Sequence, residues 1–317
     1  MEQLKSKNLC AFDNYHLRLN PRGLNGTYGC SVFFDDGQSK NEIRYKLDIS
    51  FTGNVENEIR TYRIERDSNI YVNDQKPDGF IDKLAFEVSE CLYPIDVKTS
   101  KKGKLIKILN FEEIVLRWGK RKELINEKYK SELTIKYIEA TEKSLKSEDV
   151  FLEKISKDWF LKLYFDSLYK FYSEDLYVNE SVCYPIVGNI KPIGYQVKSK
   201  IQLQEDTNDI RLEIKGNIND DRSALDIEQK LDYSYYKTLD ESEKGLKGEC
   251  NLIYLFKGNT GIIEAIEAEF NTEFSKPKKI LVKLFLLKEL TRANSFVVEN
   301  EDEAESKSGF WSRLFKK

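Results

Sequence analysis

Two acidic residues and a lysine have the types and order needed for metal-dependent cleavage of a phosphate ester. Asp78 follows a proline, and farther along the chain Asp96 and Lys98 are separated by one residue. Carboxylate oxygens bind hard divalent cations, and such a cation activates water and stabilises the phosphate. Because side chains alternate along a strand, Asp96 and Lys98 would lie on one face. The three residues are therefore the candidate catalytic set.

The arrangement Pro77-Asp78 followed by Asp96-Val97-Lys98 resembles the PD-(D/E)-x-K nuclease motif. The resemblance implies that Asp78 and Asp96 bind the cation and that Lys98 helps to position the attacking water. The same residues also have a structural interpretation, because Lys-Pro-Asp-Gly is a turn signal and a strand can carry a polar edge. A metal-dependent nuclease is therefore an alternative function.

The remaining chemistry-bearing residues do not form a recognisable site. His16 is the single histidine, which excludes most catalytic triads and zinc sites that mix His with Cys. The five cysteines show no paired spacing and are typical of a reducing compartment. Residues 217–228 depart from a calcium loop and predict a β-turn, and the glycine-rich residues 23–29 predict a loop between strands. We expect no cofactor and no resident metal.

The charge balance argues against a nucleic-acid partner. Lys and Arg total 51, Asp and Glu total 54, and the net charge is -3, whereas affinity for phosphates comes from basic excess. No apolar run reaches the roughly 20 residues of a membrane span, and the start lacks a signal-peptide pattern. The expected location is the cytoplasm, with peripheral attachment at the inner face of the membrane left open.

The order of elements predicts an α+β fold. Period-two alternation indicates strands in the N-terminal part and again in residues 185–287, with hairpin turns at Lys101-Lys-Gly and Lys257-Gly-Asn-Thr-Gly. Residues 223–236 are included among these strands. Between the two parts, Asn110 and Ser147 are predicted N-caps, and residues 148–172 read as a buried aromatic helix. Antiparallel sheets from both ends of the chain would pack around a central helical segment of about residues 110–174.

Two divisions of the chain are compatible with this pattern. In the first, residues 1–296 form a single α+β body. In the alternative, a β lobe (1–108), helices (109–176) and a second β lobe (177–296) are separate. Either way, residues 297–317 form an acidic linker followed by a C-terminal tip, because Glu and Asp are dense before Gly309.

The tip separates into an apolar and a basic side when it is placed on a helix. Its apolar residues fall within one sector, and its cations and serine fill the rest. The predicted docking residues are Phe310, Trp311, Arg313, Leu314, Phe315, Lys316 and Lys317. An anionic membrane surface and a groove on a partner protein would both accept such a tip.

The sequence therefore predicts a non-enzymatic cytoplasmic binding or assembly protein, an adaptor that docks through the tip. A carrier is the second hypothesis, because a curved sheet around helices can enclose a cavity for a hydrophobic ligand. The nuclease is the third hypothesis. The oligomeric state is left open.

Overall fold

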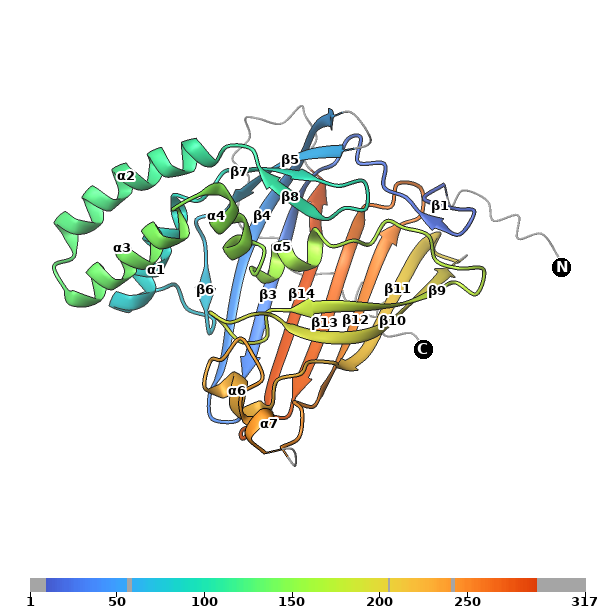
Figure 1. Cartoon of the computed structure of the whole chain (residues 1–317). Helices are drawn as coiled ribbons and strands as arrows, with labels where there is room; N and C mark the ends of the chain where they lie inside the picture. Colours follow the sequence, from blue (N-terminus) through green and yellow to red (C-terminus); the bar gives the residue numbers. More distant parts are fainter. Residues whose placement is uncertain (1–9, 56–58, 205, 241–242, 290–317) are drawn as a thin grey trace.

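A large antiparallel sheet dominates the structure, a computed structural model that describes residues 10–55, 59–204, 206–240 and 243–289. Of the described residues, 24% are helical and 42% are in strands, a mixed composition in which strand prevails. The main sheet runs in the order β8-β7-β5-β4-β3-β14-β13-β12-β11-β10-β9, with β6 paired to β4 (Figure 1). A short separate sheet pairs β1 with β2. The fold is thus α+β with β-structure predominant.

Strands from both parts of the chain meet in this one sheet. The ladder between β14 and β3 runs from Lys279 opposite Asp35 to Glu289 opposite Gly26. The strands are β1 Phe12–Asp13, β2 His16–Leu17, β3 Asn25–Asp35, β4 Lys40–Val55, β5 Ile59–Arg66, β6 Tyr71–Val72, β7 Ile95–Thr99, β8 Leu105–Ile108, β9 Tyr177–Tyr184, β10 Ile193–Gln204, β11 Asp209–Ile218, β12 Gly248–Lys257, β13 Ile263–Thr272 and β14 Lys278–Glu289.

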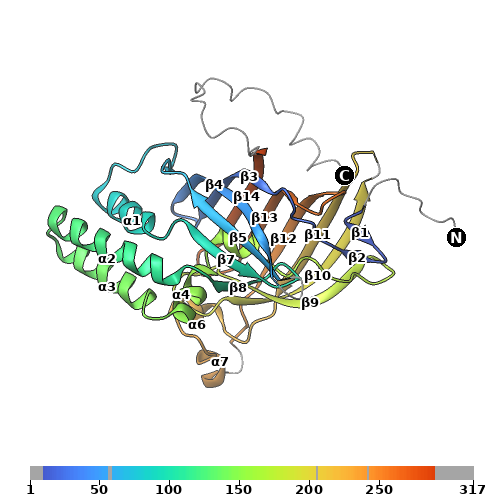
Figure 2. The same cartoon turned by 90° about the horizontal axis from the view of Figure 1, so that it is seen from above.

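Most of the helical residues lie between the two groups of strands in the sequence, but one helix lies among the N-terminal strands and two short ones lie among the C-terminal strands. The helices are α1 Phe80–Glu90, α2 Phe111–Lys128, α3 Glu132–Ser144, α4 Glu148–Ile155, α5 Trp159–Tyr164, α6 Ala224–Glu228 and α7 Tyr236–Leu239. Figure 2 shows α2 and α3 extending away from the sheet, side by side. Leu116 and Leu124 of α2 are 69% and 56% exposed, so this part of the central helical segment is not enclosed by strands. None of the described helices is long and apolar enough to cross a membrane.

The centre of the core lies where α5 and the residues after it pack on the inward face of the sheet. The Trp159 ring lies 5.0 Å from the Phe270 ring between centroids. The Tyr164 hydroxyl donates to the Tyr28 hydroxyl at 3.2 Å, and Tyr28 in turn donates to the Ile263 carbonyl at 2.7 Å. Each buried aromatic removes a large apolar area from water, and the phenols of Tyr28 and Tyr164 both have hydrogen-bond partners. These contacts fix α5 on β3 and β13.

Several local predictions are confirmed. The hairpin β7–β8 forms around the predicted lysine-glycine turn, and β12–β13 forms around the second turn, where Gly261 has φ +71°. A residue with a Cβ is strained at this φ, which explains the glycine. Ser147 caps α4 by accepting a hydrogen bond from the Val150 amide. Asn110 stands at the N-cap of α2, but its side chain bonds the Asp96 amide and the Pro94 carbonyl instead.

Other local predictions are wrong, for identifiable reasons. Residues 223–236 form α6, a turn and the start of α7 instead of a strand, because Ser223 and Asp226 make a capping box that satisfies the first amides of a helix. Because this capping box begins α6, residues 217–228 contain the start of a helix and not only the predicted β-turn. The buried aromatic helix ends at Tyr164, and α4 and α5 are separate. Helix α1 was not expected within the N-terminal strands.

Within the glycine-rich stretch at residues 23–29, Gly23 lies in a turn, whereas residues 25–29 are the beginning of β3 and were wrongly predicted as part of the loop. Gly26 and Gly29 lie under neighbouring side chains of β14. A Cβ added at Gly26 would lie 2.7 Å from Leu286 Cδ1, and one at Gly29 would lie 2.9 Å from Phe285 Cζ. These two glycines therefore make room for large side chains from the next strand and do not form a turn.

Candidate functional site

An apolar cleft of about 710 Å³ opens beside the sheet, between the helices and the ends of β3 and β14 that carry Phe34 and Lys278. Volumes of this size are typical of sites for small molecules. Its walls are mainly aliphatic and aromatic, and they come from α1, α3, α4, α5 and the segment after β9. The principal apolar lining residues are Phe34, Leu92, Tyr93, Leu145, Ile155 and Trp159.

The junction between α4 and α5 positions the polar floor of the cleft. Helix α4 ends at Ile155, and Asp158 then caps α5, with its Oδ1 accepting a hydrogen bond from the Leu161 amide at 3.0 Å. An aspartate at an N-cap satisfies an amide that would otherwise have no partner. The cap holds Asp158 at the cleft wall next to Trp159, whose ring is buried against Phe270.

The charges that line the cleft are predominantly positive. Four cations and one acid contribute to it, and they are Arg66, Lys154, Lys157, Lys278 and Asp158. Arg66 donates to the Ser89 hydroxyl at 2.7 Å and lies 4.7 Å from the centroid of the Tyr93 ring. Lys157 pairs with Glu153 at 2.9 Å. Lys154 and Lys278 make no ion pair within the described residues, so two cations are available to a ligand.

Burial acts on the titration of the groups in the cleft. Burial raises the pKa of Asp158, although the amides of Leu161 and Phe160 and the charge of Arg66 oppose the shift. Burial likewise lowers the pKa of Lys278, against the opposing charge of Asp36. Both shifts have the same cause, the partial removal of the charged group from water. An ionic group of a ligand would therefore interact with Lys278 more strongly than it would at an open surface.

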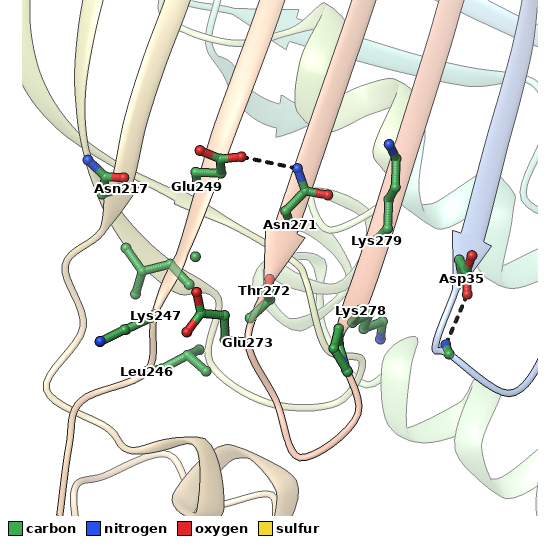
Figure 3. A pocket seen from close by; sticks show the side chains of 14 residues that line it. Asp35, Asn217, Leu246, Lys247, Glu249, Asn271, Thr272, Glu273, Lys278 and Lys279 are labelled. Carbon is green, nitrogen blue, oxygen red and sulfur yellow. Dashed lines mark hydrogen bonds between the residues drawn. The ribbon is translucent and has the colours of Figure 1, made fainter.

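A second hollow, of about 720 Å³, lies at the ends of β11–β14 (Figure 3). Lysines and acids alternate around it, and Glu249 accepts a hydrogen bond from Asn271 at 3.3 Å. Lys278 stands between this hollow and the cleft and lines both. Because opposite charges are mixed and the apolar lining is sparse, this hollow has no single chemistry to offer a ligand. The two hollows have nearly the same volume, but the lining of the cleft makes it the better candidate for a binding site.

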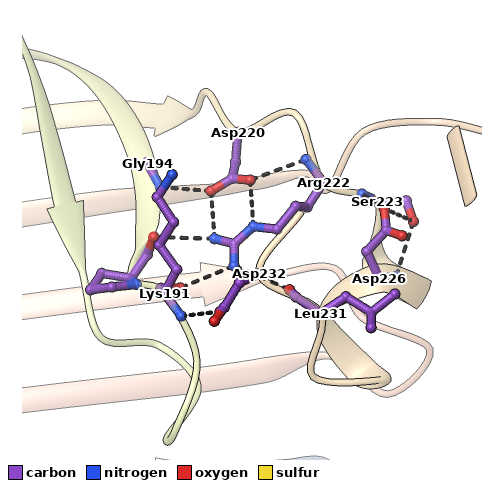
Figure 4. A network of polar contacts seen from close by, with 9 residues as sticks. Lys191, Gly194, Asp220, Arg222, Ser223, Asp226, Leu231 and Asp232 are labelled. Atoms are coloured by element: carbon purple, nitrogen blue, oxygen red, sulfur yellow. Dashed lines mark hydrogen bonds and ion pairs between the residues drawn. The ribbon is translucent and has the colours of Figure 1, made fainter. Parts of the chain in front are cut away.

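The densest polar network in the described chain lies elsewhere and is fully satisfied (Figure 4). Arg222 is 3% exposed and bonds both carboxylate oxygens of Asp220 at 2.8 Å. Its other donors reach the carbonyls of Lys191, Pro192 and Leu231. All five guanidinium N–H groups are thereby used. The network ties the segment after β11 to the start of β10 and leaves nothing free for a substrate.

The three candidate nuclease residues are divided between a loop and a strand. Asp78 is exposed in the segment before α1, whereas Asp96 and Lys98 lie on the same face of β7, as alternation predicts. The Asp96 carboxylate lies 3.5 Å from Arg63 Nε, and no hydrogen bond or ion pair of the described residues joins Asp78 to it. No cluster of three or more metal-ligating side chains occurs among the described residues. The nuclease stays a prediction.

The predicted docking residues of the tip, 310–317, lie outside the described residues. The adaptor function and its protein or membrane partner therefore stay predictions. Sequence reasoning missed the cleft altogether. Its cations come from β5, from the α4–α5 region and from β14, and residues so far apart in the chain leave no spacing motif.

Comparison with known proteins does not assign the chain to a family. No family model matches it, and no curated protein matches it. A solved structure concerned with lipid–protein interactions in lipovitellin is similar, with 12% identity and a TM-score of 0.46, which is too low to show a shared fold. The alignment covers 87% of this chain and 26% of the lipovitellin chain, so this chain spans about a quarter of that protein.

Proposed function

We propose that this protein is a non-enzymatic carrier that binds a small amphiphilic molecule with an anionic group in the cleft. The single observation that carries the proposal is the lining, an apolar cavity with cations at its rim. The apolar part of the ligand contacts Leu92, Leu145 and Trp159. The anionic group pairs with Lys278 and Lys154, which have no ion-pair partners in the described chain.

The apolar walls supply most of the affinity in this proposal. Burial of hydrocarbon contributes roughly 25 cal/mol per Å² of area removed from water. The cations supply orientation and selectivity, because hydrogen bonds from an ammonium to an anion are stronger than those to a neutral polar group. Asp158 discriminates further, since its carboxylate repels a second negative charge near the floor. A singly charged long-chain acid matches these features better than a polyanion does.

Substitution of one lysine tests the charge part of the proposal. We expect Lys278→Gln to weaken binding of a pyrene-labelled long-chain fatty acid roughly tenfold, because one charge-assisted contact is lost. The matched control is Lys279→Gln, the next residue on β14, which faces outward and pairs with Glu269 at 2.6 Å. Fluorescence titration of each variant with the labelled acid, and with the labelled alcohol of equal length, gives the dissociation constants.

A second variant tests the location. Val187→Trp fills the cleft and abolishes binding of both probes, whereas Val115→Trp, on the exposed side of α2, leaves both unchanged. Binding that survives Val187→Trp in a folded protein would rule out this cleft as the site. Equal affinity for acid and alcohol in the unsubstituted protein would rule out the anionic group.

A further inference from the structure

The central strands are apolar on their outward face as well as on their inward face. On β12, Tyr254 and Phe256 belong to the inward core, while Leu255 between them forms a separate cluster with Ala265 and Ile253. Cross-strand pairing extends this cluster into a row, because Leu255 lies opposite Ala265 and Ala265 lies opposite Phe285. Four residues before Phe285 on β14, Leu281 lies opposite Phe33 of β3. We call these residues the outward apolar row: Phe33, Ile253, Leu255, Ala265, Leu281 and Phe285.

The outward apolar row is buried at its centre, while its other four members, Phe33, Ile253, Leu281 and Phe285, are half-buried. Leu255 is 2% exposed and Ala265 is 1% exposed, although Figure 1 shows α4 and α5 on the other, inward side of the sheet. The sequences of β12 and β14 agree with this burial, since residues 252–256 and residues 284–287 are continuous apolar runs. A strand with one solvated face alternates apolar with polar residues, whereas continuous apolar runs indicate burial on both faces.

The point where the described chain ends identifies the segment that can cover the row. The described chain ends at Glu289, on the same strand that carries Leu281 and Phe285. Residues 290–309 then connect this point to the apolar tip residues Phe310, Trp311, Leu314 and Phe315. A chain of roughly 20 residues with random-coil statistics has a root-mean-square span of about 25 Å, which is enough to reach the row from Glu289. Such tethering gives the tip an effective concentration on the order of millimolar.

A carboxylate beside the row provides a charge partner for the basic tip. Glu267 faces outward on β13, between Ile253 on one neighbouring strand and Lys283 on the other. Its Oε2 atom is buried and accepts no hydrogen bond from the described residues. A buried carboxylate oxygen without a partner is costly, and Arg313 or Lys316 carries the donor it lacks.

We propose that the C-terminal tip docks on the outward apolar row of its own chain, with a tip cation at Glu267. The tip's four apolar side chains then cover Leu255, Ala265 and Phe285. In this arrangement the sheet has a helical layer on each face. The tip is held by its own body in the absence of any membrane or partner.

Tryptophan quenching in the full-length chain tests this docking. The chain has three tryptophans, of which Trp118 and Trp159 are 4% and 8% exposed, so Trp311 is the variable one. Subtraction of the Trp311→Phe variant isolates its emission. We expect the acrylamide quenching constant of Trp311 to be at least threefold lower than in a free peptide of residues 306–317, as burial of an aromatic anchor requires.

Two variants from opposite sides of the contact sharpen the test. Ala265→Arg places a long charged side chain in the row and raises the quenching constant to the peptide value. Ser181→Arg is its control, because Ser181 is exposed on β9, three strands from β12 in the sheet. If Ala265→Arg fails to fold, Leu314→Asp with Phe315→Asp disrupts the contact from the tip, outside the folded sheet, and gives the same rise.

If the tip docks elsewhere, the quenching experiment gives a different result. Trp311 as accessible in the intact chain as in the peptide overturns the proposal, as does protection that persists in folded Ala265→Arg. Protection that grows with protein concentration, together with a dimer in sedimentation, assigns the tip to a second copy. Protection that appears only with vesicles containing anionic phosphatidylserine assigns it to a membrane surface.

Discussion

Two aspartates, Asp220 and Asp158, stand in opposite electrostatic situations within one chain. The Asp220 carboxylate accepts four hydrogen bonds, from Gly194, from the Arg222 amide and from two guanidinium nitrogens. The Asp158 carboxylate caps α5 through backbone amides and has no ion-pair partner within 4 Å in the described chain. Burial works to raise the pKa of both. At Asp220 the bonds from Arg222 and Gly194 outweigh it and lower the pKa, whereas at Asp158 burial prevails.

This difference distinguishes a polar network that stabilises the fold from a site that can bind a ligand. A polar network whose donors and acceptors are all used stabilises the fold and offers nothing to a ligand. A site with unpaired cations and a poorly solvated acid has electrostatic free energy that a ligand can improve. By this criterion the Asp220–Arg222 network is structural and the cleft around Asp158 is the proposed binding site. Substitutions at the two aspartates and their neighbours therefore test the assignment.

The largest expected effect is that of Arg222→Met. The substitution removes two of the four donors to the Asp220 carboxylate and the side-chain donors to three backbone carbonyls, and breaking a buried pair in this way costs roughly 3–5 kcal/mol. Urea denaturation followed by circular dichroism measures the free energy of unfolding. Arg44→Met is the matched control. Its pair with Asp74 is exposed, so the same change there should cost no more than about 1 kcal/mol. Equal losses at the two sites would contradict the structural assignment.

Much of the sheet can be predicted from the sequence because its signals are local. The strands β10, β11 and β13 mostly alternate apolar inward with polar outward residues, and Gly261 at positive φ marks the turn between β12 and β13. The failures arise where a local signal competes with another. Ser223 and Asp226 begin a helix within a stretch that also alternates. Gly26 and Gly29 look like turn residues, although they make room for the side chains of β14.

The cleft could not be predicted, because it depends on tertiary packing. Arg66 and Lys278 belong to strands at opposite ends of the sequence, and they line one cavity only because β14 pairs with β3 and the helices fold over that junction. Neither residue has a sequence neighbour that marks it as functional. The sequence did predict a carrier as an alternative, from the general tendency of curved sheets to leave cavities, but it indicated no position.

A smaller effect is expected from pH at the structural aspartate. Because the folded pKa of Asp220 is lowered, its contribution to stability is present above the unfolded value of about 3.9 and is lost as pH falls through the folded pKa. We therefore expect Asp220→Asn to be less stable than the unsubstituted chain at pH 7, with the difference shrinking below about pH 4. Urea titrations across this range measure it. A difference independent of pH would mean that the carboxylate charge is not the stabilising element.

The smallest effect and the sharpest contrast belong to Asp158→Asn. Since burial raises the folded pKa of Asp158, the ionised form costs stability, and this cost appears as pH rises through the folded pKa. Asparagine caps a helix about as well as aspartate does. The variant should therefore equal or exceed the original stability at pH 7, and the two should converge at low pH, the reverse of the result at Asp220.

The same substitution should tighten binding of the labelled fatty acid about fivefold, roughly 1 kcal/mol, because it removes a negative charge from the cleft floor. Asp158→Ala separates the two roles of the residue, since it also removes the charge but loses the cap to Leu161 at a cost of about 1 kcal/mol. If Asp158→Asn weakens binding of the acid, the carboxylate contacts the ligand as a hydrogen-bonding group. The anionic group must then lie away from Asp158, next to Lys154 at the rim.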